Sequence, residues 1–192
     1  MNEFLLNDTP VKVWAKTVDP HAWKEIDNLS RLPFIYHHLA FMPDVHGGMG
    51  MPIGGVLATK NVVVPNAVGV DIGCGMCAVK TNLIAEEIPK ELIREKIMAG
   101  IRARMPLGMD HHSELQDEEF MPKGHDIDKL HVVSRQYTSA RRQVGTLGGG
   151  NHFIELQKDD EGYLWIMLHS GSRNLGKQVG DYYNLFAKKL NS

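Results

Sequence analysis

The sequence predicts a fold of the α/β (α+β) class, in which strands and helices are mixed along one chain. Three observations carry this prediction. Residues 11–18 alternate apolar and polar side chains, as a half-buried strand does. Residues 21–32 place apolar side chains at helical spacing, and Pro33 ends that pattern. Two apolar runs, 153–157 and 163–168, are separated by the polar turn K-D-D-E-G and indicate a β-hairpin.

The remaining elements follow from the same two periodicities. Further strands are expected at 62–64 and 77–83, on either side of a glycine-rich loop. Apolar stripes predict further helices at 92–105, at 130–144 with a stop at Gly145, and from about 175 to 190. The polar segment 106–127, with its D-E-E run, predicts a solvated surface loop.

The composition limits the classes of function. A formal net charge of −2 over 192 residues gives no global basic field, so any contact with nucleic acid must use a local patch. No apolar run approaches the roughly 20 residues that span a bilayer, which argues against a membrane partner. The N-terminus lacks the basic and apolar regions of a secretory signal, and the chain has 2 cysteines. We therefore expect a reducing, cytoplasmic location.

Both cysteines lie in V-G-V-D-I-G-C-G-M-C (68–77). Cys74 and Cys77 fit a redox C-x-x-C pair or half of a zinc knuckle, although the chain has no second C-x-x-C. For Cys77 we favour a simpler interpretation, a small apolar side chain that begins a buried strand. Asp71 and Cys74 together offer a carboxylate and a thiolate, which suit Mn²⁺ or Zn²⁺, and a thiolate can bridge two ions. The alternative is an Asx-type turn beside an incidental thiol.

Two histidines flank the predicted hairpin. A symmetric register centred between residues 160 and 161 places His152 and His169 directly opposite each other, with Cβ atoms about 5 Å apart. Imidazoles at that separation can share a metal ion, although a bulge in the turn would shift the register. One metal site would account at once for these two histidines, Asp71 and Cys74. The other histidines are expected to be structural or solvated: His21, His37, His38, His111, His112, His125 and His131.

Three further segments suggest contacts with phosphate or nucleotide. Asp44 and His46 lie two apart in M-P-D-V-H and point the same way if that segment is extended, as ligands, partners of ligands or phosphate contacts. Otherwise Asp44 caps backbone amides in a turn. The glycines of G-T-L-G-G-G-N-H-F-I-E (145–155) expose backbone amides beside Asn151, but the segment lacks the G-K-[ST] of a P-loop. Amides at the start of the last helix, with Arg173 nearby, can receive a phosphate.

These segments resemble the RNA-splicing ligase RtcB family. The matching motifs are L-S-R-L-P-F-I, M-P-D-V-H-G-G-M-G-M-P-I-G-G, P-N-A-V-G-V-D-I-G-C-G-M, K-T-N-L, G-T-L-G-G-G-N-H-F-I-E and L-H-S-G-S-R. The resemblance runs from about residue 20 to the C-terminus and is weakest at 106–127, which we expect to be a variable loop. It implies an α/β arrangement particular to the family, with mixed sheets and flanking helices. It further implies a single catalytic domain, 1–192, that is incomplete at its C-terminus.

The resemblance also implies an activity. The family joins RNA ends bearing a 3′-phosphate or a 2′,3′-cyclic phosphate to 5′-hydroxyl ends, in tRNA splicing or RNA repair. It uses GTP and Mn²⁺ and proceeds through a histidine–GMP intermediate. By resemblance, two manganese ions with Cys74 between them are held by Asp71, Cys74, His152 and His169. The GMP site is lined by Asn151, His152, Phe153, Ile154 and Glu155, and contacts with RNA or phosphate come from Asp44, His46 and Arg173.

Two features depart from the family pattern. Members are about twice as long, so the nucleophilic histidine is expected outside these residues, and the chain alone is expected to bind metal poorly and not to ligate. Cys77 stands where a different residue is expected, and it would make the site more sensitive to oxidation. Two alternatives stay open: a non-ligating metal- and RNA-binding module, and a metal-dependent phosphoesterase. The sequence also leaves open whether an activating protein partner is needed.

Overall fold

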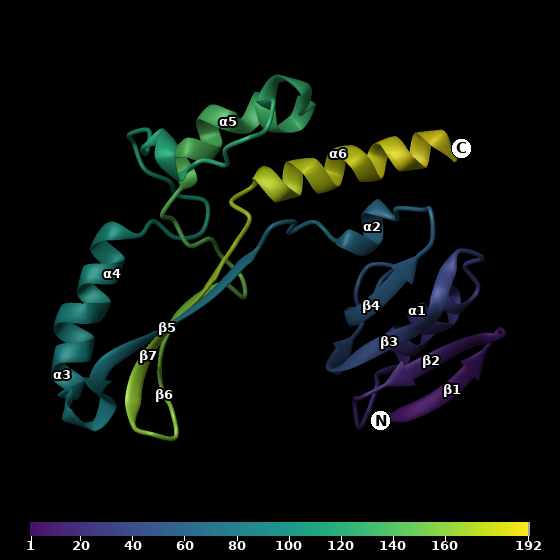
Figure 1. Ribbon diagram of the computed structural model, residues 1–192, viewed down its shortest axis with the longest axis horizontal. Helices are drawn as coiled ribbons and strands as arrows, with labels where there is room; N and C mark the ends of the chain where they lie inside the picture. The colour runs from purple at the N-terminus through teal and green to yellow at the C-terminus, as the bar shows by residue number, and fades with distance from the viewer. Residues whose placement is uncertain (192) are drawn as a thin grey trace. The chain divides into compact units, whose positions relative to one another are not determined.

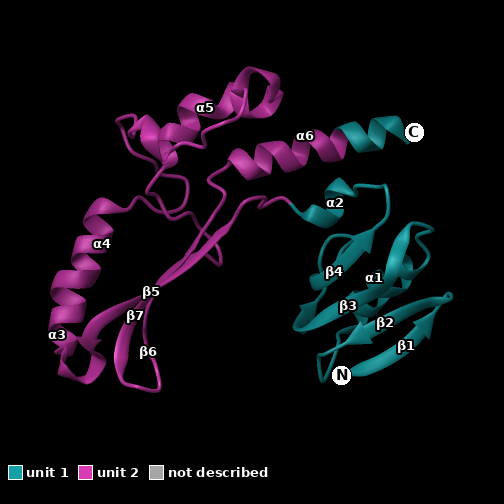
Figure 2. Cartoon of the chain, viewed as in Figure 1, with its two compact units in different colours: residues 1–69, 186–192 teal, residues 70–185 magenta. Residues whose placement is uncertain are grey.

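The computed structural model describes residues 1–191, which form two compact units (Figure 2). Unit 1 comprises Met1–Gly69 with Phe186–Ser192, and unit 2 comprises Val70–Leu185. The single catalytic domain expected from the sequence is not tested by this division and stays a prediction.

Strands and helices are mixed in both units, which confirms the α+β class (Figure 1). The strands are β1 (Asn2–Leu6), β2 (Thr9–Val13), β3 (Ile35–His46), β4 (Ile53–Thr59), β5 (Gly75–Ile84), β6 (Phe153–Lys158) and β7 (Tyr163–Ser170). The helices are α1 (Pro20–Ser30), α2 (Pro65–Val68), α3 (Lys90–Leu92), α4 (Ala99–Arg104), α5 (His131–Gln143) and α6 (Leu175–Leu190). A π-helical segment, η2 (Ile93–Met98), joins α3 to α4, and short 3₁₀ helices are η1 (Ala85–Glu87), η3 (Glu118–Phe120) and η4 (Ile127–Lys129). No helix among the described residues combines the length and apolarity needed to cross a bilayer.

Unit 1 is a four-stranded sheet in the order β1-β2-β3-β4, in which only the β2–β3 pair is parallel. Helix α1 connects the two parallel strands. Asp19 caps its N-terminus by accepting hydrogen bonds from the amides of His21 and Ala22, and Pro20 occupies the first turn, where no amide donor is needed. The apolar face of α1 packs on the sheet through fully buried side chains that include Ile26 and Phe41. This core holds α1 against the sheet of unit 1.

Unit 2 contains an antiparallel sheet in the order β5-β7-β6. Because β7 lies between the other two strands and runs opposite to both, its C-terminal end meets the starts of β5 and β6 at one end of the sheet. The segments that carry Cys74, His152 and His169 meet at that end. The sheet therefore collects residues that are far apart in sequence.

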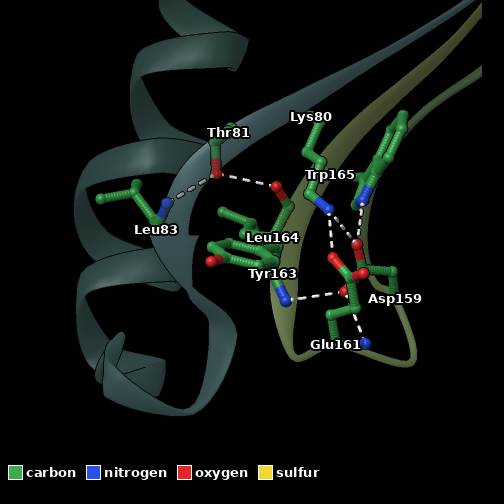
Figure 3. A network of polar contacts seen from close by, with 8 residues as sticks. All are labelled: Lys80, Thr81, Leu83, Asp159, Glu161, Tyr163, Leu164 and Trp165. Atoms are coloured by element: carbon green, nitrogen blue, oxygen red, sulfur yellow. Dashed lines mark hydrogen bonds and ion pairs between the residues drawn. The ribbon is translucent and has the colours of Figure 1, made fainter.

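The opposite end of this sheet is fixed by a polar network around Asp159 (Figure 3). Nζ of Lys80 lies 2.6 Å from Glu161 and 3.1 Å from Asp159, and it sits over the ring of Tyr163. Asp159 also accepts hydrogen bonds from Nε1 of Trp165 and from the Tyr163 amide. The Trp165 hydrogen bond is the main reason that the pKa of Asp159 is lowered to about 2. The network ties β5 to the β6–β7 turn.

The register of the hairpin differs from the expected one. His169 pairs with Phe153, not with His152, so the ladder is symmetric about Glu161. The cause is a three-residue loop, residues 160–162. The Gly162 amide donates to the Asp159 carbonyl, and Gly162 has a φ of 90°. Such a left-handed glycine forms a bulge that adds one residue to one strand. The symmetric-register prediction was therefore wrong by one residue.

Most other predicted elements are confirmed. The helices expected at 21–32, 92–105, 130–144 and 175–190 correspond to α1, to α3 with η2 and α4, to α5 and to α6. The strands of the hairpin and the strand at 77–83 are also present, whereas the strand expected over 11–18 covers Thr9–Val13. Residues 62–64 form a loop before α2 and not a strand, because the sheet of unit 1 ends at β4. The strands β1, β3 and β4 were not anticipated.

Candidate metal centre and its cavity

Asp71 and Cys74 lie on the turn that leads into β5. Gly69 and Gly73 on this turn both have a φ of 90°, which a residue with a Cβ rarely adopts. His169 lies near the end of β7, the strand next to β5, where it pairs with Met76. These local conformations explain how a turn and two strand ends converge.

Three of the four predicted metal ligands come together in unit 2. Cys74, His152 and His169 each offer a ligand atom, and these atoms all lie within 4.8 Å of one another. Sγ of Cys74 is 3.5 Å from Nε2 of His152, and the rings of His152 and His169 have centroids 5.0 Å apart. Asp71, the fourth predicted ligand, places Oδ2 at 2.8 Å from the same Nε2. The expected neighbourhood is therefore formed despite the shifted register.

The two acidic groups of the cluster influence each other. Burial raises the pKa of Asp71, but hydrogen bonds from the Cys74 thiol, the Ser172 hydroxyl and amide, and His152 outweigh it and hold this pKa well below its usual value. Burial, followed by the contact with Asp71, raises the pKa of Cys74 to about 11. In the absence of an ion, Asp71 is thus ionised and Cys74 carries its proton at neutral pH.

The ring of His152 is held tightly by two glycines. Its side chain is only 9% exposed, and Nδ1 is buried with no hydrogen-bond partner among the described residues. A Cβ on Gly171 would lie 2.7 Å from Cε1 of this ring, and one on Gly148 would lie 2.9 Å from Nδ1. Real Cβ contacts are not this short, so any side chain at either position would displace the ring. The glycines are therefore required by the position of His152.

The donor set fits a transition-metal ion. One thiolate and two imidazoles, with a carboxylate beside them, match the ligands preferred by Zn²⁺ and related ions, and the carboxylate suits Mn²⁺. Binding requires Cys74 to lose its proton, which a coordinated cation favours. Cys74, His152 and His169 are therefore the residues that can hold an ion, with Asp71 as a further ligand or as the partner of His152.

A cavity of about 860 Å³ adjoins this cluster within unit 2. Its wall includes Asp71, His152, Asn151 and Arg173. Burial lowers the pKa of Arg173, and the charge of Asp71 opposes this effect; a guanidinium remains charged in either case. The cavity thus combines a cation, an amide and a candidate metal centre, a combination that suits an anionic ligand.

The residues predicted to line a GMP site are only partly at this cavity. Asn151 and His152 belong to its wall. Phe153, Ile154 and Glu155 continue along β6, where Phe153 packs its ring 5.6 Å from that of His169. Their contacts with a nucleotide stay predictions.

Asp44 and His46 lie in unit 1, near the end of β3. They flank the buried Val45 and are both exposed, as expected for an extended segment. Nδ1 of His46 donates to the Asp44 carbonyl at 2.7 Å. Their predicted role as phosphate contacts stays a prediction.

Two acidic residues that sequence analysis missed hold the glycine loop after His46. Asp19 accepts a hydrogen bond from the Gly47 amide at 3.0 Å. The buried Glu25 accepts from the amides of Gly48 and Gly50 at 2.8 and 2.6 Å. These amides are therefore satisfied within unit 1. The sequence signal for Glu25 was a charged residue on the face of α1 that is otherwise mostly apolar.

Cys77 corrects one expectation. Cys77 was expected to begin a buried strand. It lies within β5 instead, opposite Leu168, and its side chain is exposed. The reason is that β5 is an edge strand of its sheet, and most of its side chains are exposed among the described residues. Cys74 and Cys77 are both free thiols.

His111 was also missed as a site residue, since it was expected to be structural or solvated. The structure places it in the wall of the cavity, together with Met109 and Lys177. The only signal in the sequence was M-D-H-H inside the polar segment 106–127. Composition alone could not distinguish this segment from an ordinary solvated loop.

The fold and the site define an α+β protein with a candidate thiolate–imidazole metal centre beside a cavity. The family model described as tRNA-splicing ligase RtcB matches residues 25–127 and 115–192, and the chain belongs to this family. It is 39% identical to the RNA-splicing ligase RtcB of Escherichia coli strain K12, over 98% of this chain and 50% of the relative. It is 32% identical to the tRNA-splicing ligase RtcB of Nanoarchaeum equitans, over 95% of this chain and 49% of the relative. The chain thus spans about half the length of the curated relatives it matches.

Proposed function

We propose that this chain forms part of a GTP- and Mn²⁺-dependent RNA ligase, which joins 3′-phosphate or 2′,3′-cyclic phosphate ends to 5′-hydroxyl ends through a histidine–GMP intermediate. The single observation that carries the proposal is the cluster of Cys74, His152 and His169 beside Asp71, in a chain of this family. The Escherichia coli relative is named an RNA-splicing ligase. The biological task would be tRNA splicing or RNA repair, in the cytoplasm.

The chain's own residues suit this chemistry in defined ways. Cys74, His152 and His169, with Asp71, would hold Mn²⁺, expected as two ions. When bound, such ions neutralise phosphate charge and orient the reacting oxygens. Gly148 and Gly171 keep the His152 ring in place. No residue of this chain is assigned as the nucleophile.

The cavity residues would position the phosphate. The charged guanidinium of Arg173 lies in the wall of the cavity and provides a cation for an anionic group. The Asn151 amide, in the same wall, can donate to a phosphate oxygen. Burial raises the pKa of Asp71, but hydrogen bonds from the Cys74 thiol, Ser172 and His152 keep this carboxyl ionised, so it would be available as a ligand of the bound ion.

The test uses the protein as its host makes it. Incubation with radiolabelled GTP and Mn²⁺ should give a covalent protein–GMP adduct, and a 3′-phosphate RNA mixed with a 5′-hydroxyl RNA should give a ligated product. Cys74→Ser should abolish both reactions, whereas Cys77→Ser, its matched control three residues away on exposed β5, should retain them.

Other outcomes would replace the proposal. RNA binding without an adduct would indicate a non-ligating metal- and RNA-binding module. Release of phosphate from the RNA without GTP and without a ligated product would indicate a phosphoesterase. If the adduct forms only after host extract is added, an activating protein partner is needed.

A further inference from the structure

The start of the polar segment 106–127 is attached to the glycine loop that precedes His152. Leu107 forms a parallel bridge with Gly148, and the Gly108 amide donates to the Gly148 carbonyl at 3.0 Å. The Leu147 amide donates to the Pro106 carbonyl at 3.1 Å. This part of the segment is therefore paired with the loop that carries the candidate ligand.

Arg173 strengthens this attachment. Its Nε donates to Oγ1 of Thr146 at 2.6 Å, and one terminal nitrogen donates to the carbonyls of Gly108 and Asp110 at 3.0 and 3.3 Å. The same side chain thus holds both the glycine loop and residues 108–110. Its guanidinium is fixed in the cavity wall, and residues 108–110 are fixed with it.

The next residues are attached to the end of α5. The His112 amide donates to the Arg142 carbonyl at 3.0 Å, and Arg142 returns a hydrogen bond to the Ser113 carbonyl at 2.6 Å. Arg141 binds the Gln116 carbonyl through two nitrogens. Residues 109–111 therefore lie between two anchored stretches, so their backbone is held beside the cavity.

Two of these side chains line the cavity, with complementary chemistry. Met109 lies in the wall of the cavity and is 91% exposed, so its thioether is accessible to a ligand there. Nδ1 of His111 lies 3.1 Å from the His112 carbonyl, which can only accept, so in the neutral ring Nδ1 is the donor and the lone pair is on Nε2. A thioether and a flat imidazole suit contact with a nucleobase, and the lone pair suits a ribose hydroxyl or a base donor.

We propose that Met109 and His111 contact the base and ribose of a nucleotide unit whose phosphate lies toward Arg173 and the metal centre. This inference rests on the proposed function and extends it to residues outside the family motifs quoted above. A cavity of about 860 Å³ lies within the usual range for small-ligand sites. The nucleotide is either the terminal residue of an RNA end or a free guanosine nucleotide, and both share this chemistry.

The experiment compares two double variants of the protein as its host makes it. Met109→Ala with His111→Ala removes the two proposed contacts. Phe120→Ala with His125→Ala changes an exposed aromatic and an exposed histidine of the same polar segment that do not line the cavity. Binding of a 3′-phosphorylated RNA and of GTP is measured by fluorescence anisotropy in Mn²⁺. The same RNA with an abasic terminal nucleotide, and ribose triphosphate in place of GTP, report whether the base is involved.

The expected result is about 5- to 10-fold weaker binding of one ligand by the first variant only, as for the loss of a modest base contact. The difference should disappear with the ligand that lacks the base. Loss confined to the RNA assigns the cavity to the RNA end, and loss confined to GTP assigns it to the free nucleotide. Unchanged binding of both ligands, or equal losses in both double variants, overturns the inference.

Ligation by the unmodified protein distinguishes failure of the nucleotide contact from failure of the proposed function. If it ligates and the Met109/His111 variant binds normally, the inference fails and the proposed function stands. If it does not ligate but the variant loses base-dependent binding, the proposed function fails and the nucleotide contact stands.

Discussion

Oδ2 of Asp71 lies 2.8 Å from Nε2 of His152, although 81 positions separate the two residues in sequence. The same nitrogen lies 3.5 Å from Sγ of Cys74. The carboxylate of Asp71 and the thiol of Cys74 thus both lie next to Nε2 of His152. Any ion bound by His152 through Nε2 must share or replace the contact with Asp71, so the position of this ring controls the whole cluster.

Gly171→Ala should weaken Mn²⁺ binding by at least about tenfold without removing any ligand. The new Cβ would lie 2.7 Å from Cε1 of His152, so the ring must shift from its position beside Cys74 and His169. Misplaced ligand supports typically cost about 10- to 100-fold in metal affinity. Isothermal titration with Mn²⁺, on the protein as its host makes it, measures the effect. Gly100→Ala, in helix α4, is the control and should leave affinity unchanged. Equal affinity in all three proteins would contradict the proposed packing.

Arg173→Lys should loosen residues 106–112 while keeping the positive charge. Lysine lacks the planar fork that reaches Thr146, Gly108 and Asp110 together. We expect faster hydrogen exchange at the Gly108 and His112 amides and a loss of about 1 to 3 kcal/mol in the free energy of unfolding. Mass-spectrometric hydrogen exchange measures the first effect. Arg135→Lys, an exposed change on α5, should leave exchange in this segment as it is; protection that survives in Arg173→Lys would show that the segment is held by other contacts.

Asp159→Asn should reduce the loss of stability in acid. The pKa of Asp159 is lowered to about 2 from its ordinary value of 3.8, chiefly by the Trp165 hydrogen bond. A lowered carboxyl pKa stabilises the fold above the unfolded pKa, and this contribution disappears as the pH falls from about 4 toward 2. Thermal unfolding midpoints from pH 5 to pH 2 should therefore fall less steeply in Asp159→Asn than in the unmodified protein. Asp160→Asn, at the next turn position, should keep the original slope.

Glu25→Ala should destabilise unit 1 by about 1 to 3 kcal/mol, because it leaves the amides of Gly48 and Gly50 without their acceptor. Glu25→Gln keeps one carboxamide oxygen and should lose less. Urea unfolding, with tryptophan fluorescence as the signal, measures both. Lys24→Ala, an exposed change on the same helix, is the control. Equal stability of the Ala and Gln variants would mean that the loop finds other partners.

The sequence predicted local elements well where one periodicity dominates. Helix α1 begins at a capping aspartate followed by proline, and both signals are local. The β6–β7 hairpin was predicted from two apolar runs around a polar turn. Its register could not be predicted, because one left-handed glycine, Gly162, shifts every pair along the ladder. That shift depends on a dihedral angle and not on apolar periodicity.

Strand β3 was missed for a different reason. Pro43 and the glycines after His46 indicate a turn, since proline cannot donate to a ladder. In the structure Pro43 falls between Phe41 and His46, where the pairing with β4 is irregular and the missing donor is tolerated. The strand therefore continues through a proline, a residue that normally indicates that a segment is not a central strand.

The candidate site was predicted in part. Cys74, His152 and His169 lie near one another as expected from their donor types, although the register used to bring the two histidines together was wrong by one residue. The cavity wall formed by Met109 and His111 was not anticipated, since it depends on hydrogen bonds from Arg173 to residues 63 and 65 positions earlier. Such long-range contacts leave no periodic trace in the sequence. Whether the grouped residues bind Mn²⁺ stays a prediction.

The turn at Asp159–Gly162 has a consequence for how this centre can change over evolution. Its three-residue loop determines which residue of β6 stands across from His169 at the other end of the ladder. Removal of a single turn residue would move the partner strand by one place and exchange the faces of all its side chains. The set of donor atoms available to an ion can therefore be rewritten by a deletion far from it, with every cysteine, histidine and aspartate left intact.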